Sequence, residues 1–99
     1  MFRHVVMFQW AEGVGDDHVA RVAAELDHLV EVIPEIRGYR HGRDAGVNAG
    51  NFDYVVVGDF DSVDGYLAYR DHPVHQAFVR DLIAGKVAGR AAVQYDIGD

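Results

Sequence analysis

The segment Asp53-Tyr54-Val55-Val56-Val57-Gly58-Asp59-Phe60 has the clearest strand signal in the chain, because β-branched and aromatic residues dominate it. Alternate residues of a strand point to opposite faces of its sheet. The two faces carry Tyr54, Val56, Gly58 and Phe60 on one side, and Val55, Val57 and Asp59 on the other. Neither face is polar along its middle, whereas a strand with one solvated face alternates apolar and polar residues. The segment therefore predicts a sheet that is covered on both faces.

Three further strands and three helical segments are expected around this one. The strands are expected over residues 3–10, 36–44, 53–60 and 91–97. Apolar residues recur at spacings of three and four from Val19 to Ile33, which predicts an amphipathic helix that Asp16 or Asp17 caps and Pro34 stops.

Two shorter helices are expected between the last two strands. The first runs to about residue 70 and is capped by Asp61 or Ser62, and the second runs over residues 73–83. Gly85 and Gly89 are expected to end the second helix. The resulting order, β-α-β-β-α-β, predicts an α+β protomer with the ferredoxin-like arrangement and a four-stranded antiparallel sheet.

A four-stranded sheet whose helices all lie on one face leaves its other face open. We expect the open face to carry largely apolar side chains, among them His4, Val6, Phe8, Tyr54 and Val56. Monomers rarely expose an apolar patch of that size, and each such side chain contributes roughly 1.5–3 kcal/mol when buried. The sequence therefore predicts a homodimer through the open sheet face, forming a dimeric α/β barrel. The alternative is a monomer whose second face is only a shallow apolar surface.

The composition excludes several classes of protein. The chain has 99 residues, which predicts one domain over residues 1–99, and its 9 basic and 16 acidic residues leave a net charge of −7. An acidic chain with scattered basic residues lacks the positive patch that nucleic acids or anionic membranes require. There is no cysteine, and the apolar run after the N-terminus has only the length of a strand. We therefore expect a soluble, cytoplasmic protein with no nucleic-acid or membrane partner.

The segment Tyr69-Arg70-Asp71-His72-Pro73-Val74-His75 is the strongest candidate for a functional site. Proline disfavours helical geometry at the preceding residue and suits the first turn of a new helix, so one helix should end here and another begin. Tyr69 and His75 would then meet at a helix–helix junction. A histidine titrates near neutrality and can remove a proton next to a carbonyl, and a phenol can donate a hydrogen bond to the oxygen where charge develops.

Each of these residues also has a purely structural interpretation. His72 is most simply the cap of the second helix, His75 a core histidine, Tyr69 a packing residue, and His4 a structural or solvated residue. His18 and His28 are expected on the wet face of the long helix. A metal site of His4, His41 and His75 has no supporting spacing, and the glycine-rich loop over residues 42–51 lacks the Gly-Lys-Ser/Thr ending of a phosphate cradle. The sequence implies no metal and no organic cofactor.

Four pieces of the chain together resemble the stress-responsive α/β-barrel (Dabb) domain family. They are Arg3-His4-Val5-Val6-Met7-Phe8, the loop from Gly46 to Tyr54, the His-Pro-x-His of the segment from Tyr69 to His75, and Val93-Gln94-Tyr95-Asp96. The resemblance covers nearly the whole chain. It implies a dimeric α+β barrel with a ferredoxin-like protomer, in a family in which most members have no known function and some plant members are stress-induced.

The resemblance also implies roles for individual residues. A characterised plant relative by fold and motif is a cyclase that closes a linear polyketide thioester by intramolecular aldol condensation. By analogy Tyr69 would hold a substrate carbonyl and His75 would be the general base, while Tyr54 stands where the cyclase has a histidine in its third strand. The substrate-binding residues expected here are His4, Val6, Phe8, Tyr54, Val56, His72 and Phe78.

The sequence is compatible with three functions. The first is a homodimer that binds a small carbonyl or aromatic molecule in a pocket between sheet and helices, with cyclase- or lyase-like acid–base chemistry. The second is a non-catalytic, stress-associated dimer. The third is a haem-handling or monooxygenase-like barrel of related topology.

Overall fold

The computed structural model describes residues 1–98, so Asp99, the last residue of the expected domain, lies outside it. Four strands form one antiparallel sheet in the order β2-β3-β1-β4. The strands are β1 (Phe2–Trp10), β2 (Gly38–Arg43), β3 (Tyr54–Phe60) and β4 (Val87–Asp96). The helical elements are α1 (Asp16–Val32), α2 (Val63–Asp71), α3 (Pro73–Phe78) and the π-helical turn η1 (Val79–Ile83). This is the predicted ferredoxin-like fold.

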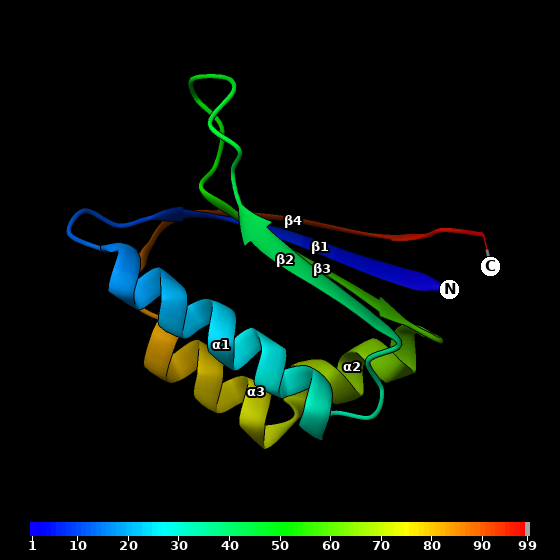
Figure 1. Ribbon diagram of the computed structural model, residues 1–99. Helices are drawn as coiled ribbons and strands as arrows, with labels where there is room; N and C mark the ends of the chain where they lie inside the picture. Colours follow the sequence, from blue (N-terminus) through cyan, green and yellow to red (C-terminus); the bar gives the residue numbers. More distant parts are fainter. Residues whose placement is uncertain (99) are drawn as a thin grey trace.

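All helices lie on one side of the sheet, as Figure 1 shows. The opposite side has no helix over it, and the loop between β2 and β3 projects away from the helices. Among residues 1–98, no helix combines the length and the apolar content needed to cross a membrane. The strand ends lie within two residues of expectation except that β4 begins at Val87. Gly89 therefore lies inside that strand and does not end the preceding helix.

The ends of the helices follow local chemistry. Ser62 accepts a hydrogen bond from the Gly65 amide at 3.2 Å and caps α2, as expected. His72 caps α3 in the same way, because its Nδ1 accepts from the Val74 amide at 3.1 Å. Neither Asp16 nor Asp17 caps α1: the N-cap is Gly15, and the two carboxylates lie in the first turn, where the helix dipole favours negative charge.

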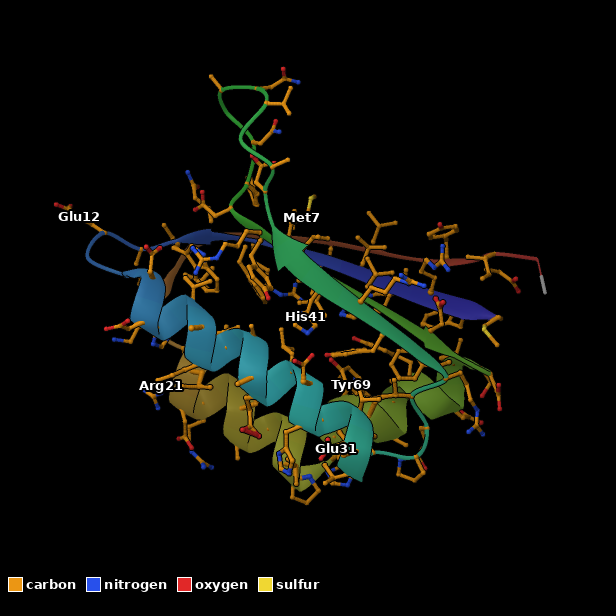
Figure 2. All side chains as sticks on the ribbon, viewed as in Figure 1. Met7, Glu12, Arg21, Glu31, His41 and Tyr69 are labelled. Carbon is orange, nitrogen blue, oxygen red and sulfur yellow. The ribbon has the colours of Figure 1, made fainter. Side chains whose placement is uncertain are left out.

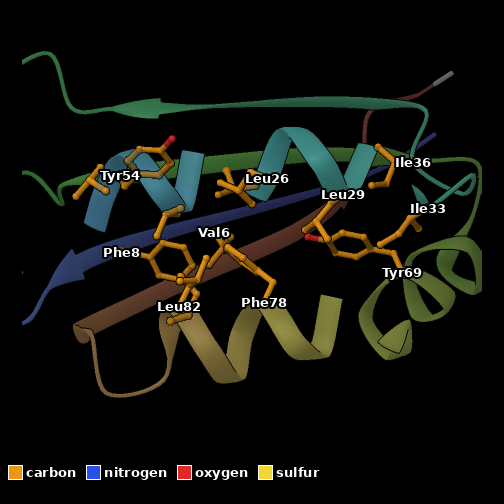
Figure 3. Close-up of a cluster of buried hydrophobic side chains, with 14 of the residues drawn as sticks. Val6, Phe8, Leu26, Leu29, Ile33, Ile36, Tyr54, Tyr69, Phe78 and Leu82 are labelled. Atoms are coloured by element: carbon orange, nitrogen blue, oxygen red, sulfur yellow. The ribbon is translucent and has the colours of Figure 1, made fainter. Parts of the chain in front are cut away.

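The core lies between the sheet and the helices, and Figure 3 shows its side chains meeting there. Fully enclosed residues come from both layers, including Val22, Leu26, Leu29, Ile33 and Phe60. The inward face of β3 carries Tyr54, Val56 and Phe60, all buried. Burial of side chains of this size is the main stabilising contribution to the protomer.

The assignment of His4, Val6, Phe8, Tyr54 and Val56 to the open face was wrong. These residues are at most 6% exposed within a single chain, and they pack under the helices. Both faces of the central strands are apolar, so alternation divided the residues into two sets without saying which set the helices cover. The bulkier set, which includes His4, Phe8 and Tyr54, fills the space beneath the helices.

The open face is nevertheless apolar along its middle. It carries the other alternation set of the strands, with Val93 62%, Tyr95 47% and Met7 39% exposed. Figure 2 shows Met7 pointing away from the helices, while Tyr69 and His41 lie on the helical side. Near its edge this face also carries Arg3, which bonds Asp59 through two contacts of 2.7 and 2.9 Å. This charged pair holds down the pKa of Asp59.

Candidate functional site

A cavity of about 250 Å³ lies between the sheet and the helices. Its volume lies just below the roughly 300–1,000 Å³ that is typical of ligand sites, so it suits only a small molecule. Every layer of the fold contributes to its walls. The lining residues are His4, Val6, Phe8, Leu26, Tyr39, Val56, Tyr66, Tyr69, Arg70, His75, Phe78, Val79, Ile83 and Arg90.

Tyr69 and His75 meet in this cavity. Their ring centroids are 4.3 Å apart, with an angle of 40° between the ring planes. The break at Pro73 produces this approach, because α2 ends at Asp71 and α3 starts again two residues later in a new direction. Tyr69 is 3% exposed, and Figure 3 shows its ring among the buried side chains near Leu29 and Ile33.

A backbone hydrogen bond sets the protonation of His75. Its Nδ1 lies 3.0 Å from the carbonyl oxygen of Arg70, and a carbonyl only accepts, so Nδ1 carries the hydrogen. The neutral ring therefore keeps its lone pair on Nε2. Burial lowers the pKa of His75, although the bond to Arg70 opposes this effect. At neutral pH the ring is therefore uncharged and its Nε2 can accept a proton.

The hydroxyl of Tyr69 is held by a second tyrosine. Tyr39, on the helical side of β2, places its hydroxyl oxygen 2.6 Å from that of Tyr69. Burial raises the pKa of Tyr69 to about 12, and the hydrogen bond with Tyr39 opposes the rise. Both phenols therefore keep their protons at neutral pH, and one of them can donate to an oxygen in the cavity.

His4 presents a different atom to the same space. The Gln94 amide nitrogen lies 2.9 Å from Nδ1 of His4 and can only donate, so Nδ1 accepts and Nε2 carries the hydrogen. No enclosed side-chain nitrogen or oxygen among residues 1–98 lacks a partner, and Nε2 of His4 has no hydrogen bond there, so this atom opens onto the cavity. Burial, followed by the positive charge of Arg90, lowers the pKa of His4 to about 4.

The sequence-predicted site residues divide into two groups. His4, Val6, Phe8, Val56, Tyr69, His75 and Phe78 line the cavity. Tyr54 and His72 do not. His72 is turned to the Val74 amide as a helix cap. The Tyr54 hydroxyl lies 2.7 Å from Nδ1 of His41, whose Nε2 lies 2.7 Å from Asp27, so a polar chain ties β3 and β2 to α1.

One histidine outside the cavity departs from expectation. His18 was expected to be solvated, but its Nε2 donates to the carbonyl oxygen of Leu82 at 2.8 Å. This bond ties α1 to η1. His28 is exposed as expected and bonds the Glu25 carboxylate at 2.8 Å.

Sequence reasoning missed several lining residues, among them Tyr39, Tyr66 and Arg90, and it missed Gln94 as the partner of His4. Tyr66 precedes Tyr69 by three residues on α2, a spacing that puts both on one helical face. Tyr39 could be placed on one face of its strand by alternation, but its partner could not be named. Arg90 lies before the predicted start of the last strand, and Gln94 has no signal beyond its position opposite His4 in the register.

The site therefore combines a base, a donor pair and apolar walls. His75 offers a lone pair, the pair of Tyr39 and Tyr69 offers a hydroxyl proton, and His4 offers an N–H. No aspartate or glutamate is among the lining residues. Such an arrangement can move a proton at a carbon or oxygen next to a polarised carbonyl.

Comparison with known proteins identifies relatives by sequence and by structure. A stress-response A/B barrel domain-containing protein of Arabidopsis thaliana is 28% identical over 80 residues, covering 78% of this chain and 69% of its own. The crystal structure of a dimeric ferredoxin-like protein of unknown function from Thermobifida fusca is 43% identical, with a TM-score of 0.90 over 97% of this chain and 90% of that one.

A hydroxynitrile lyase from Passiflora edulis also has this fold. It superposes with a TM-score of 0.86 over 99% of this chain and 94% of its own, at 20% identity, which shows likeness of fold alone. The model of the stress responsive A/B barrel domain matches residues 2–97. The chain therefore belongs to the stress responsive A/B barrel domain (Dabb) family.

Proposed function

We propose that the cavity binds a small carbonyl or aromatic compound and that Tyr69 and His75 perform acid–base chemistry on it. The observation that carries this proposal is the approach of the two rings to 4.3 Å inside a mainly apolar cavity. Their electrostatics support it as well. His75 has a lowered pKa and is neutral at pH 7, while Tyr69, with a pKa of about 12, keeps its proton.

The proposed reaction begins with proton removal. Nε2 of His75 takes a proton from the carbon next to the carbonyl, and the electron pair of that C–H bond moves to the carbonyl oxygen. The resulting enolate oxygen accepts a hydrogen bond from the tyrosine pair, and the carbon is then free to attack a second carbonyl or to be reprotonated. A positioned general base contributes roughly 10²–10⁴ in rate, and one oxyanion donor roughly 10²–10³.

The fold of the Passiflora edulis hydroxynitrile lyase supports a lyase-like reaction in this chain, because a protein of the same architecture is an enzyme. The likeness between the two proteins is one of protomer fold. The substrate of that enzyme is not carried over, and the argument for catalysis rests on the residues of this cavity.

Hydrogen exchange at carbon tests the proposal directly. We expect the protein to accelerate exchange of the α-protons of 4-phenylbutan-2-one in D₂O at neutral pD, followed by NMR. His75→Ala should lower the rate by about 10² or more, and Tyr69→Phe by a similar factor. His28→Ala, which changes an exposed histidine on α1, is the matched control and should leave the rate unchanged. Exchange no faster than in buffer, or full activity in His75→Ala, would overturn the assignment.

The proposal includes assembly as a homodimer through the open sheet face. The Thermobifida fusca protein, 43% identical, is described as dimeric, which supports the same assembly here. The open face of this chain is apolar at its centre, and an isolated protomer leaves Val93 and Tyr95 about half exposed. Packing two such faces together removes this surface from water.

A further inference from the structure

Arg90 is placed on the cavity side of the sheet. It pairs across the strands with Phe8, and cross-strand partners in register point to the same face, so Arg90 shares the face of Phe8 and His4. Arg90 lines the cavity and is also exposed, so the residue lies at the mouth of the cavity. It stands on β4, which is an edge strand of the sheet.

No acidic residue in the described part of the chain, residues 1–98, pairs with the Arg90 guanidinium. Elsewhere aspartates bond the arginines at positions 3, 37, 43, 70 and 80. Within residues 1–98, Arg90 has no hydrogen bond or ion pair. The other arginine of the cavity, Arg70, is bonded to Asp71 at 2.8 Å. Because no carboxylate lines the cavity, the charge at its mouth is positive in a chain whose net charge is −7.

The charge of Arg90 reaches into the site. It lowers the pKa of His4, and so does His75, which places His4 within electrostatic range of both. The cavity therefore has two polar regions around His4: a cationic mouth at Arg90, and the donor–acceptor group of Tyr69 and His75. The cavity also has apolar walls, with Val6, Phe8 and Phe78 among the lining residues.

We propose that the cavity selects a ligand that carries a carboxylate in addition to its carbonyl group, with Arg90 binding the carboxylate at the mouth. The planar guanidinium forms two parallel hydrogen bonds with a carboxylate, which fixes orientation as well as charge. The carbonyl end then points toward Tyr69 and His75, and the apolar body lies between them. This inference rests on the proposed function, because it assumes that the cavity holds the carbonyl compound.

Binding of a matched acid and ester tests the inference. The probes are 4-oxo-4-phenylbutanoate and its methyl ester, titrated into the whole protein by calorimetry at low salt. We expect the acid to bind roughly tenfold more tightly than the ester. Arg90→Gln should abolish this preference by weakening the acid alone, and Arg90→Lys should retain part of it, since lysine keeps the charge and loses the paired geometry.

The control is Arg80→Gln, which removes an exposed arginine that is bonded to Asp81 outside the cavity, and it should leave both affinities unchanged. Equal binding of acid and ester by the native protein would overturn the role of Arg90 and leave the proposed function standing. A preference for the acid over the ester that persists in Arg90→Gln would also overturn the role of Arg90 and leave the proposed function standing. Failure of both probes to bind would overturn the inference and the proposed function together.

Discussion

The hydroxyl oxygens of Tyr39 and Tyr69 lie 2.6 Å apart, in a hydrogen bond that joins the edge strand β2 to helix α2 inside the cavity. Burial raises the pKa of both phenols. When Tyr39 donates, the proton of Tyr69 is left for a ligand oxygen, and the bond stabilises the charge that would develop on Tyr69. The direction of this hydrogen bond therefore determines which of the two hydroxyl groups can donate to the ligand.

Tyr39→Phe removes this bond while keeping the ring. A hydrogen bond of this kind contributes about 1 kcal/mol net, so we expect a loss of that size in the free energy of unfolding, measured with urea. The α-proton exchange rate should fall by roughly 2- to 10-fold, less than in Tyr69→Phe, because Tyr69 still reaches the ligand. An exchange rate as low as that of Tyr69→Phe would show that Tyr39 is the direct donor.

Gly58→Ala should displace the Tyr39 ring and so disturb the hydrogen bond between Tyr39 and Tyr69. Gly58 lies opposite Tyr39 in the register, and an added methyl group would meet the Tyr39 ring at 3.2 Å and the Phe60 ring at 3.1 Å. Overpacking of this kind costs roughly 1–3 kcal/mol, and the shift of Tyr39 should slow exchange. Gly42→Ala is the matched control, since nothing lies within 4 Å of its added methyl group. Equal stability of the two variants by urea unfolding would contradict the packing argument.

Acid should destabilise the protomer partly through His4. The folded pKa of about 4 lies below the ordinary value of 6.5, so the unfolded chain binds more protons between these limits. The contribution of His4 to the free energy of unfolding is complete above pH 6.5 and is lost as the pH falls toward 4. Its size is about 2 kcal/mol, allowing for the partial solvation of a ring that faces a cavity. His75, whose pKa is also lowered, acts in the same direction.

The measurement compares the native protein with His4→Gln by urea unfolding at pH 7.5 and pH 4.5. The variant should be less stable at pH 7.5, because it loses the contacts of the buried ring. The difference in free energy of unfolding between the native protein and the variant should be smaller by about 2 kcal/mol at pH 4.5. His28→Gln, which changes an exposed histidine on α1, is the matched control. A difference that stays constant with pH would show that His4 does not titrate differently on folding.

Val93→Glu should separate the homodimer. Val93 is 62% exposed on the open face of the protomer, so a charge there is tolerated by the isolated chain and buried in the proposed dimer. We expect sedimentation at micromolar concentration to show a dimer for the native protein and a monomer for the variant. Val30→Glu changes a valine that is 44% exposed on α1 and should remain dimeric. A native protein that sediments as a monomer would contradict the proposed homodimer.

Local patterns determined most of the fold. Alternating and three-to-four spacings place β1, β3 and α1 within a residue or two of their observed ends, because each pattern reflects a single element that must bury one side. The same holds for Ser62 and His72 as caps and for the break at Pro73, since these depend on residues only a few positions apart. The meeting of Tyr69 with His75 follows from that break.

Only the tertiary structure decided which sheet face is inside and which atoms meet in the cavity. When both faces of a strand are apolar, alternation cannot say which one the helices cover, so the interior position of His4 depends on the packing of whole layers. The bond between Tyr39 and Tyr69 and the bond of His4 to Gln94 join residues 30 and 90 positions apart. Contacts at such separations arise from the pairing of distant strands and helices, which no local pattern of residues encodes.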